Sequence, residues 1–320
     1  MCFWLVDQSL IYVQNIKTQM INCWMHMKLR EVTATPKAME KLNRWKRDIQ
    51  NLTAGSYRPY LTVRAVNKVG RRHKLMCDIQ NRQVHLLSDG ELRMYKKLIH
   101  TRGVIRVLEQ YALNLDETLD IAVAANLIHP RNWETNEAHV MTTDFVVQQR
   151  SKASPSEIMT VAYSFKYAGQ IYEFDEEEEV LLELFDEDGF NMEEHERKNA
   201  RTWQKFAIEH EYWRKRGVEY RIVTEYHATK EESWNIDFCR LGGKRTYSLD
   251  QVTRFVHSFC SVWLKHFTKP LIYLWELTAK ELSCSPDDVK QVFKYSVLHH
   301  YLPLVHSSCL QKYRPVELAI

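Results

Sequence analysis

The sequence predicts an α/β protein of two domains, in which a core of strands and helices is followed by a smaller, mostly helical region. Between about residues 58 and 230, short runs rich in β-branched and aromatic residues alternate with stretches of helical spacing. After Glu231 the pattern changes to aromatic-rich helices. The chain has 320 residues, 45% of them hydrophobic, which is enough for two packed cores.

The first 57 residues form a separate N-terminal segment in this prediction. Its start is apolar but is interrupted by Asp7 and Lys17, and it has neither a basic beginning nor a small-residue cleavage site. We therefore expect no membrane span and no signal peptide. Because the residues before Met27 have no clear amphipathic period, we hypothesise that the native protein begins near Met27.

Basic residues dominate the stretch from Lys28 to Lys74, which holds thirteen Lys or Arg and three acids. Within it, residues 36–52 have the apolar spacing of an amphipathic helix. Such a surface can bind phosphates, although a basic patch can equally well serve only to solvate a helix face. The candidate DNA-binding residues are Lys41, Arg44, Arg47, Arg71 and Arg72.

The α/β core begins with three strand-like runs, YLTVRAV, HKLMCDI and RQVHLL, separated by turns. The following SDGELRMYKKLIH has helical spacing, with Ser88 as N-cap and Glu91 at the third helical position, as in a capping box. Glu91 is therefore expected in the first turn of a helix that directly follows a strand.

Further strands are predicted at VIRVLEQYAL, VMTTDFVVQ, EIMTVAYSFKY and EYRIVTE, with a long helix from about Arg197 to Gly217 before the last. An acidic insert at residues 170–196 holds thirteen acids between Glu173 and Glu196 and no Lys or Arg. We favour a surface loop with one short helix over a docking motif or a DNA mimic.

Residues 231–320 form the predicted C-terminal helical domain, with helices in SLDQVTRFVHSFCSVWLKHF, KPLIYLWELTAKEL and SPDDVKQVFKYSVLHHYL. Ser285 and Pro286 are a strong helix start. The last two helices and their tight polar connection have the spacing of a helix-turn-helix, although an ordinary helical hairpin fits equally well.

Chemistry is concentrated at three charged residues of the predicted core. Asp144 lies in an apolar strand, where an unpaired carboxylate is costly. Strand alternation puts Lys166 on the same face as Ser164. Together with Glu91, these side chains could bind Mg²⁺ and position a water molecule for phosphodiester hydrolysis. Spacing alone favours the alternative of a buried Asp144–Lys166 ion pair without a ligand.

At these residues the chain resembles the TnsA-like endonuclease subunits of heteromeric bacterial transposases. The segments YLTVRAV, RRHKLMCDIQNRQVHLLSDGELRMY, HVMTTDFVV, VAYSFKYA and EHEYWRKRGVEYRIVTE follow the family's order and spacing, from about Arg58 to Glu225. The resemblance implies a restriction-endonuclease-like mixed sheet flanked by helices at residues 58–230. It also implies a C-terminal domain of winged-helix or helix-turn-helix type that contacts a partner.

The resemblance further implies that Glu91 and Asp144 are ligands of Mg²⁺, for which Mn²⁺ can substitute, and that Lys166 activates water. The chain departs from the family at Ser164, where an acid or Gln is expected and a hydroxyl is only a weak metal ligand. Water and a strand carbonyl could complete the site, a helical carboxylate from Glu209 or Glu211 could lean in, or catalysis could be impaired. Glu209 and Glu211 are each more readily interpreted as members of a solvated helix face.

By resemblance, the protein would nick the 5′ ends of a transposon, alongside a TnsB-like transposase and a TnsC-like ATPase regulator. An alternative is a catalytically impaired scaffold that bridges DNA, transposase and regulator, and a stand-alone nuclease is a third. The seven cysteines are scattered without zinc-site spacing. Reduced thiols in a bacterial cytoplasm are therefore expected.

Overall fold

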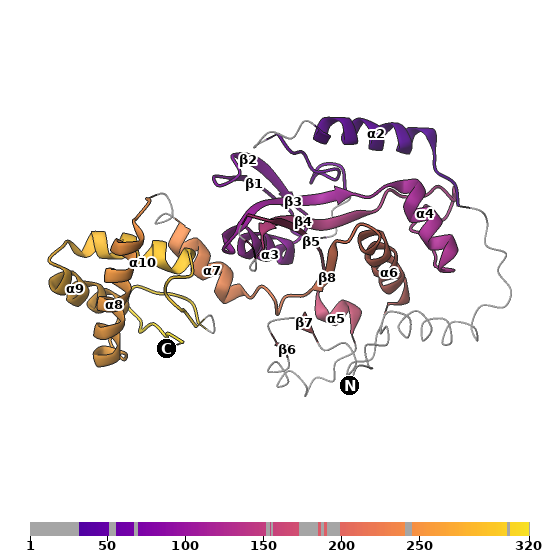
Figure 1. The fold of residues 1–320 in the computed structure, drawn as a ribbon. Coiled ribbons are helices and arrows are strands. Elements are labelled where there is room, and N and C mark those ends of the chain that lie inside the picture. The colour runs from indigo at the N-terminus through magenta and orange to yellow at the C-terminus, as the bar shows by residue number, and fades with distance from the viewer. Residues whose placement is uncertain are drawn as a thin grey trace, which may run out of the picture.

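The computed structural model describes residues 32–50, 56–66, 70–151, 154, 156–172, 185–186, 189–190, 199–240, 245–305 and 308–319. The hypothesis of a start near Met27 and most of the acidic insert at residues 170–196 lie outside these residues. The described residues form a strand-rich part and a separate group of helices, joined through α7 (Lys230–Cys239) (Figure 1).

The basic helix of the N-terminal segment is confirmed as α2 (Pro36–Gln50). Its apolar side chains Leu42 and Trp45 are buried against the core, and Trp45 Nε1 donates to the Arg58 carbonyl oxygen at 2.9 Å. The strand predicted in YLTVRAV is wrong, because the described residues there form turns. The Arg72 guanidinium binds the carbonyl oxygens of Val63 and Val66 and folds this segment as a loop.

The other predicted strands are present and form two sheets. A hairpin of β1 (His73–Cys77) and β2 (Arg82–Leu86) precedes α3 (Asp89–His100). The main sheet has the order β3-β4-β5-β8, with bounds Val104–Ala112, Thr142–Arg150, Ile158–Phe165 and Glu219–Val223. The first three strands are antiparallel and β8 runs parallel to β5, so the predicted mixed sheet is confirmed.

Alternation along the strands gives the sheet two covered faces. On one face Val107, Val147 and Val161 belong to the apolar cluster around α3. On the other face Leu108, Val146 and Ala162 pack with residues of α2, α4 (Leu115–Ala124) and α6 (Ala200–Arg214). Helices lie on both faces of the sheet (Figure 1), and residues in its middle, such as Val147 and Ala162, are fully buried. The short α5 (Ala168–Ile171) and the hairpin β6 (Phe185–Asp186) and β7 (Gly189–Phe190) lie between β5 and α6 in sequence.

The C-terminal group contains the three predicted helices, α8 (Leu249–His266), α9 (Leu271–Leu282) and α10 (Pro286–Leu298). They share a core that includes Phe259, Leu274 and Phe293. A left-handed Ser283 ends α9, and the side chain of Ser285 caps α10, which produces the tight connection expected of a helix-turn-helix.

The helix α7, which the sequence pattern did not reveal, connects the two parts. Asp237 of α7 forms an ion pair with Lys96 of α3, with 2.6 Å between Oδ2 and Nζ. The helix α7 also packs on α10. The predicted domain boundary between residues 230 and 231 falls at the start of this helix and stays a prediction. No helix within the described residues is long and apolar enough to cross a membrane.

Candidate active site

The first predicted site residue, Glu91, is fixed by the start of α3. Ser88 Oγ accepts a hydrogen bond from the Glu91 main-chain N–H at 3.0 Å, which confirms the predicted cap. The Glu91 carboxylate turns back and accepts from the Leu87 N–H at 2.9 Å. Gly90 allows α3 to approach β5 closely, since a Cβ there would lie 2.1 Å from the Phe165 ring.

The side chain of Asp144 on β4 lies close to the Glu91 carboxylate. Its Oδ2 accepts from the Phe165 N–H of β5 at 2.8 Å. Its Oδ1 accepts from Gln110 Nε2 of β3 at 3.2 Å, and the same nitrogen donates to Glu91 Oε2 at 3.2 Å. Two carboxylates that are far apart in sequence therefore converge on one amide.

The charge of this pair is poorly compensated. Glu91 is only 8% exposed, and burial, together with the Asp144 carboxylate, raises the pKa of Glu91 to about 7. The hydrogen bonds from Leu87 and Ser88 and the charge of Lys166 oppose this shift without cancelling it. The site therefore holds negative charge that a cation would stabilise.

Lys166 lies directly after β5, and its main-chain N–H donates to the Val223 carbonyl oxygen at 3.0 Å. Its ammonium group acts electrostatically on Glu91. Among the described residues it forms no ion pair, so the alternative of a closed Asp144–Lys166 pair is not what the structure contains. Its charge lowers the pKa of Glu91, so the lysine lies near the acidic pair.

Ser164 connects instead to a third carboxylate. The Ser164 side chain is buried, and its Oγ donates to Glu209 Oε2 of α6 at 2.6 Å. Thr143 Oγ1 donates to the same oxygen at 3.1 Å, and Lys205 Nζ lies 3.3 Å from Glu209 Oε1. The expectation that Glu209 belongs to a solvated helix face is wrong, because Glu209 is fully buried and bonded to side chains of β4 and β5.

Glu211, the other candidate on α6, lies outside this cluster. It pairs with Arg214 at 2.6 Å on a partly exposed part of the helix, as the solvated-face interpretation expected. The two residues differ because an α-helix turns about 200° over two positions, so Glu209 and Glu211 lie on different sides of α6.

Two members of the site were missed from the sequence, Gln110 and Lys205. Burial alone would lower the pKa of Lys205, but the carboxylates of Glu209, Asp144 and Glu91 together raise it above its ordinary value. A lysine four residues before Glu209 was a visible sign of an ion pair. Gln110, a polar residue in an apolar strand, was the other available sign.

Mg²⁺ is the metal that the resemblance implies, and the residues fit it in part. Glu91 and Asp144 offer the oxygen donors that Mg²⁺ prefers, and the raised pKa of Glu91 reflects negative charge that a bound cation would compensate. Within the described residues no three His, Cys, Asp or Glu side chains gather around one point as metal ligands. An ion would thus be held by two carboxylates, with water or a main-chain carbonyl completing its coordination, while the Ser164 hydroxyl is engaged by Glu209.

The candidate DNA-binding residues divide into two kinds. Lys41, Arg44 and Arg47 are exposed on α2, where Lys41 Nζ lies 4.2 Å from the centroid of the Tyr60 ring. Arg71 is also exposed. Arg72, by contrast, uses its guanidinium to hold loop carbonyls, so its first role is structural.

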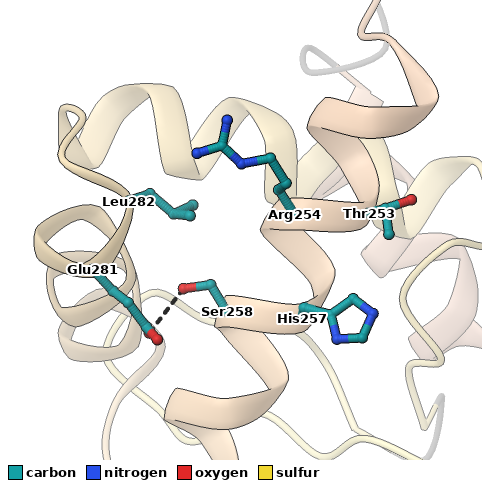
Figure 2. A pocket seen from close by; sticks show the side chains of 6 residues that line it. All are labelled: Thr253, Arg254, His257, Ser258, Glu281 and Leu282. Atoms are coloured by element: carbon teal, nitrogen blue, oxygen red, sulfur yellow. Dashed lines mark hydrogen bonds between the residues drawn. The ribbon is translucent and has the colours of Figure 1, made fainter.

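A pocket of about 380 Å³ between α8 and α9 lies in the C-terminal helices and contains none of the acidic site residues. Ser258 Oγ donates to Glu281 Oε2 across it at 2.8 Å, and Arg254 and His257 line its rim (Figure 2). It is open to solvent and provides no link to the Glu91–Asp144 pair.

The comparison with known proteins agrees with this geometry. The family model described as TnsA-like endonuclease N terminal matches residues 101–225. The resemblance to the TnsA-like endonucleases is confirmed. Asp144, Lys166 and Glu209 lie inside this TnsA-like segment, whereas Glu91 precedes it.

A curated relative extends the comparison. The chain is similar to the transposon Tn7 transposition protein TnsA of Escherichia coli, with 28% identity over 182 residues. Those residues make up 57% of this chain and 55% of the relative, so the match spans about half of the length of that protein.

Proposed function

We propose that this chain is the Mg²⁺-dependent endonuclease subunit of a heteromeric transposase, which nicks the 5′ ends of a transposon during cut-and-paste transposition. One observation carries the proposal: Glu91 and Asp144 converge on one amide in a chain with a TnsA-like endonuclease segment, and Lys166, which forms no ion pair with another described residue, acts electrostatically on Glu91. Carboxylates and a lysine in this arrangement suit phosphodiester hydrolysis.

Each residue has a defined task in this proposal. Glu91 and Asp144 would hold Mg²⁺, for which Mn²⁺ can substitute, and the ion would neutralise the phosphate and lower the pKa of a bound water. Lys166 would orient or deprotonate that water. Glu209 would hold the strands of the site in place. Its carboxylate accepts hydrogen bonds from the hydroxyls of Ser164 and Thr143 and forms an ion pair with Lys205.

The partners are part of the proposal. A TnsB-like transposase would cut and join the 3′ ends, a TnsC-like ATPase would regulate both subunits, and the C-terminal helices would contact the ATPase. Transposon-end DNA would reach the site along the basic arm, where Lys41, Arg44 and Arg47 are exposed. We place the complex in a bacterial cytoplasm, in keeping with the five free cysteines among the described residues.

A scaffold that has lost catalysis is a second candidate, favoured by one specific observation. Ser164 replaces the acid or Gln of the family pattern, and the nearby Glu209 is engaged by Lys205 and by Ser164 itself. Such a protein would still join DNA, transposase and regulator.

Strand-specific cleavage separates the two candidates. The full chain is assembled with its partner transposase on a labelled transposon end in Mg²⁺, and cuts are mapped for the wild type, Asp144→Ala and Lys166→Ala. We expect a 5′ cut that Asp144→Ala abolishes and that Lys166→Ala slows by about 10²- to 10⁴-fold. Glu211→Ala is the matched control on α6 and should cut normally. If only 3′ cuts occur and no variant changes them, the chain is a scaffold.

A further inference from the structure

The most unusual residue of the site is Gln110, in the middle of β3. Its φ is 50°, which is the left-handed region that favours glycine, although the strand pairs on both sides, Glu109 with Phe145 and Tyr111 with Thr143, are intact. A non-glycine residue keeps such a conformation only where its surroundings determine it, and this occurs most often at functional sites.

The surroundings of Gln110 hold it from several directions. Its side chain is 1% exposed, and its carbonyl oxygen accepts from the Tyr60 N–H at 3.1 Å. Gln110 Oε1 accepts from Thr142 Oγ1 at 3.3 Å, which leaves Nε2 facing the two acids. The opposite amide orientation would place Oε1 3.2 Å from oxygens of both carboxylates, where it would be repelled.

We propose that Gln110 is a positioning residue for the metal site: its amide fixes the spacing of Glu91 and Asp144 and so sets the affinity of this pair for a divalent cation. The inference rests on the proposed function. Its physical basis is that two like charges repel at short range. The main-chain N–H groups of Leu87 and Phe165 orient each carboxylate separately, whereas the Gln110 amide donates to both and so opposes their repulsion. Residues that orient metal ligands in this way contribute strongly to metal affinity.

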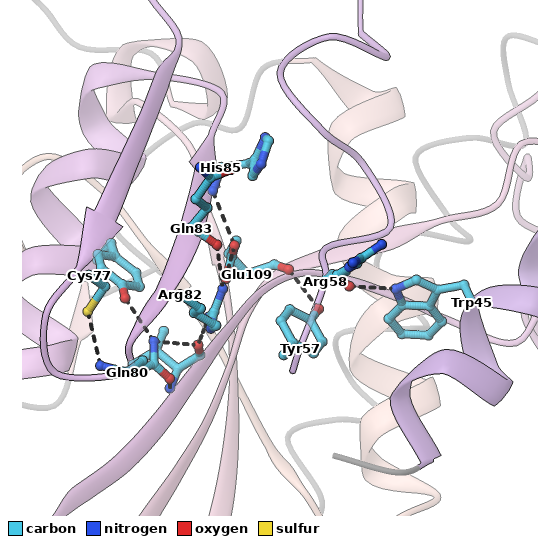
Figure 3. Close-up of polar contacts among 11 residues, drawn as sticks. Trp45, Tyr57, Arg58, Cys77, Gln80, Arg82, Gln83, His85 and Glu109 are labelled. Carbon is cyan, nitrogen blue, oxygen red and sulfur yellow. Dashed lines mark hydrogen bonds and ion pairs between the residues drawn. The ribbon is translucent and has the colours of Figure 1, made fainter. Parts of the chain in front are cut away.

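Gln80 offers a matched control, because it is also a glutamine and its side chain is hydrogen-bonded to the main chain of β3. Its Nε2 donates to Tyr95 Oη at 2.8 Å and to the Val107 carbonyl oxygen at 3.1 Å, and its Oε1 accepts from the Val107 N–H at 3.0 Å. Figure 3 shows Gln80 among its polar contacts. It makes as many side-chain hydrogen bonds as Gln110, but none of them is to Glu91 or Asp144. A purely structural role of Gln110 would resemble that of Gln80.

The test is calorimetric titration of the full chain with Mn²⁺, in the presence of a DNA duplex, for wild type, Gln110→Met, Gln110→Gly and Gln80→Met. The methionine keeps the volume but has no donor, and the glycine relieves the left-handed backbone. We expect both Gln110 variants to bind Mn²⁺ about 10- to 100-fold more weakly and Gln80→Met to bind like the wild type. Thermal unfolding of each variant verifies that it is folded.

Two other results have distinct meanings. If the wild type binds Mn²⁺ and Gln110→Met binds it equally well, Gln110 is only a structural residue and the inference is overturned. If the wild type itself binds no Mn²⁺ and makes no cut, the proposed metal-dependent function fails, and this inference fails with it.

Discussion

Two pairs of charged groups meet at neighbouring residues of β3, and they are compensated in opposite ways. All four groups are buried except Asp144, which is partly buried. In the first pair, Glu109 receives two hydrogen bonds from Arg82, at 2.9 and 2.6 Å, and a third from the His85 N–H (Figure 3). In the second, Glu91 and Asp144 share the amide of Gln110, and their other donors are the neutral groups of Leu87, Ser88 and Phe165. Among the described residues no cationic side chain is bonded to either carboxylate.

The difference shows how one strand can carry both a structural and a functional site. The Glu109 carboxylate raises the pKa of Arg82 despite its burial, whereas burial raises the pKa of Glu109 against the bonds from Arg82. Each charge of the first pair is thus directly opposed by a bonded partner of the other sign. The second pair keeps excess negative charge in a region with little water, which costs stability until a cation binds. The free energy of unfolding is thus lowered at the Glu91–Asp144 pair, where we expect a cation to bind.

Breaking the compensated pair should have the largest effect. We expect Arg82→Met to lower the free energy of unfolding by about 3–5 kcal/mol, because it leaves the fully buried Glu109 carboxylate without its partner. Urea denaturation measures the loss. The control is Arg221→Met, which removes an exposed pair with Glu219 and should cost at most about 1 kcal/mol. Equal losses in the two variants would contradict the comparison.

The uncompensated pair should make stability depend on pH. Since the folded-state pKa of Glu91 is raised to about 7 from an ordinary value of 4.5, the folded protein binds a proton that the unfolded chain releases. Stability should therefore fall as pH rises from 4.5 to 7, by on the order of 3 kcal/mol in the absence of divalent cations. Urea denaturation at pH 5 and pH 8 in EDTA measures this, and the fall should be smaller in Glu91→Gln. A Glu91→Gln variant with the wild-type pH dependence would contradict the assignment.

The supporting carboxylate of α6 gives a smaller effect. Ser164→Ala removes a 2.6 Å hydrogen bond to the buried Glu209 and should cost about 2 kcal/mol of unfolding free energy. Ser258→Ala removes a bond to Glu281, a residue of similar chemistry that is exposed beside the pocket of Figure 2, and should cost about 0.5–1 kcal/mol. If Ser258→Ala were the more damaging of the two, Glu209 would not be the buried support described.

The sequence predicted what local patterns determine. The Ser88 cap, the strand that carries Asp144 and the C-terminal helices follow from periodicity and capping residues within a few positions of one another. The resemblance to the TnsA-like family supplied the roles of Glu91, Asp144 and Lys166, which spacing alone did not favour.

The sequence did not predict what depends on contacts between distant segments. The strand pattern of YLTVRAV was overridden by Arg72, which binds its carbonyls. Glu209 looked like a surface residue because periodicity does not reveal that Ser164 and Thr143 would meet it. Nothing in the strand pattern around Gln110 indicated a left-handed backbone.

The most direct test of the comparison is the unfolding temperature of the wild type, Asp144→Asn and Glu109→Gln, each with and without Mn²⁺. Without metal, Glu109→Gln should be destabilised, whereas Asp144→Asn should be at least as stable as the wild type because a repulsion is removed. At 100 times the dissociation constant, Mn²⁺ should stabilise the wild type by about 2.7 kcal/mol. We predict that this stabilisation persists in Glu109→Gln and is lost in Asp144→Asn. An undiminished response to Mn²⁺ in Asp144→Asn would contradict the account.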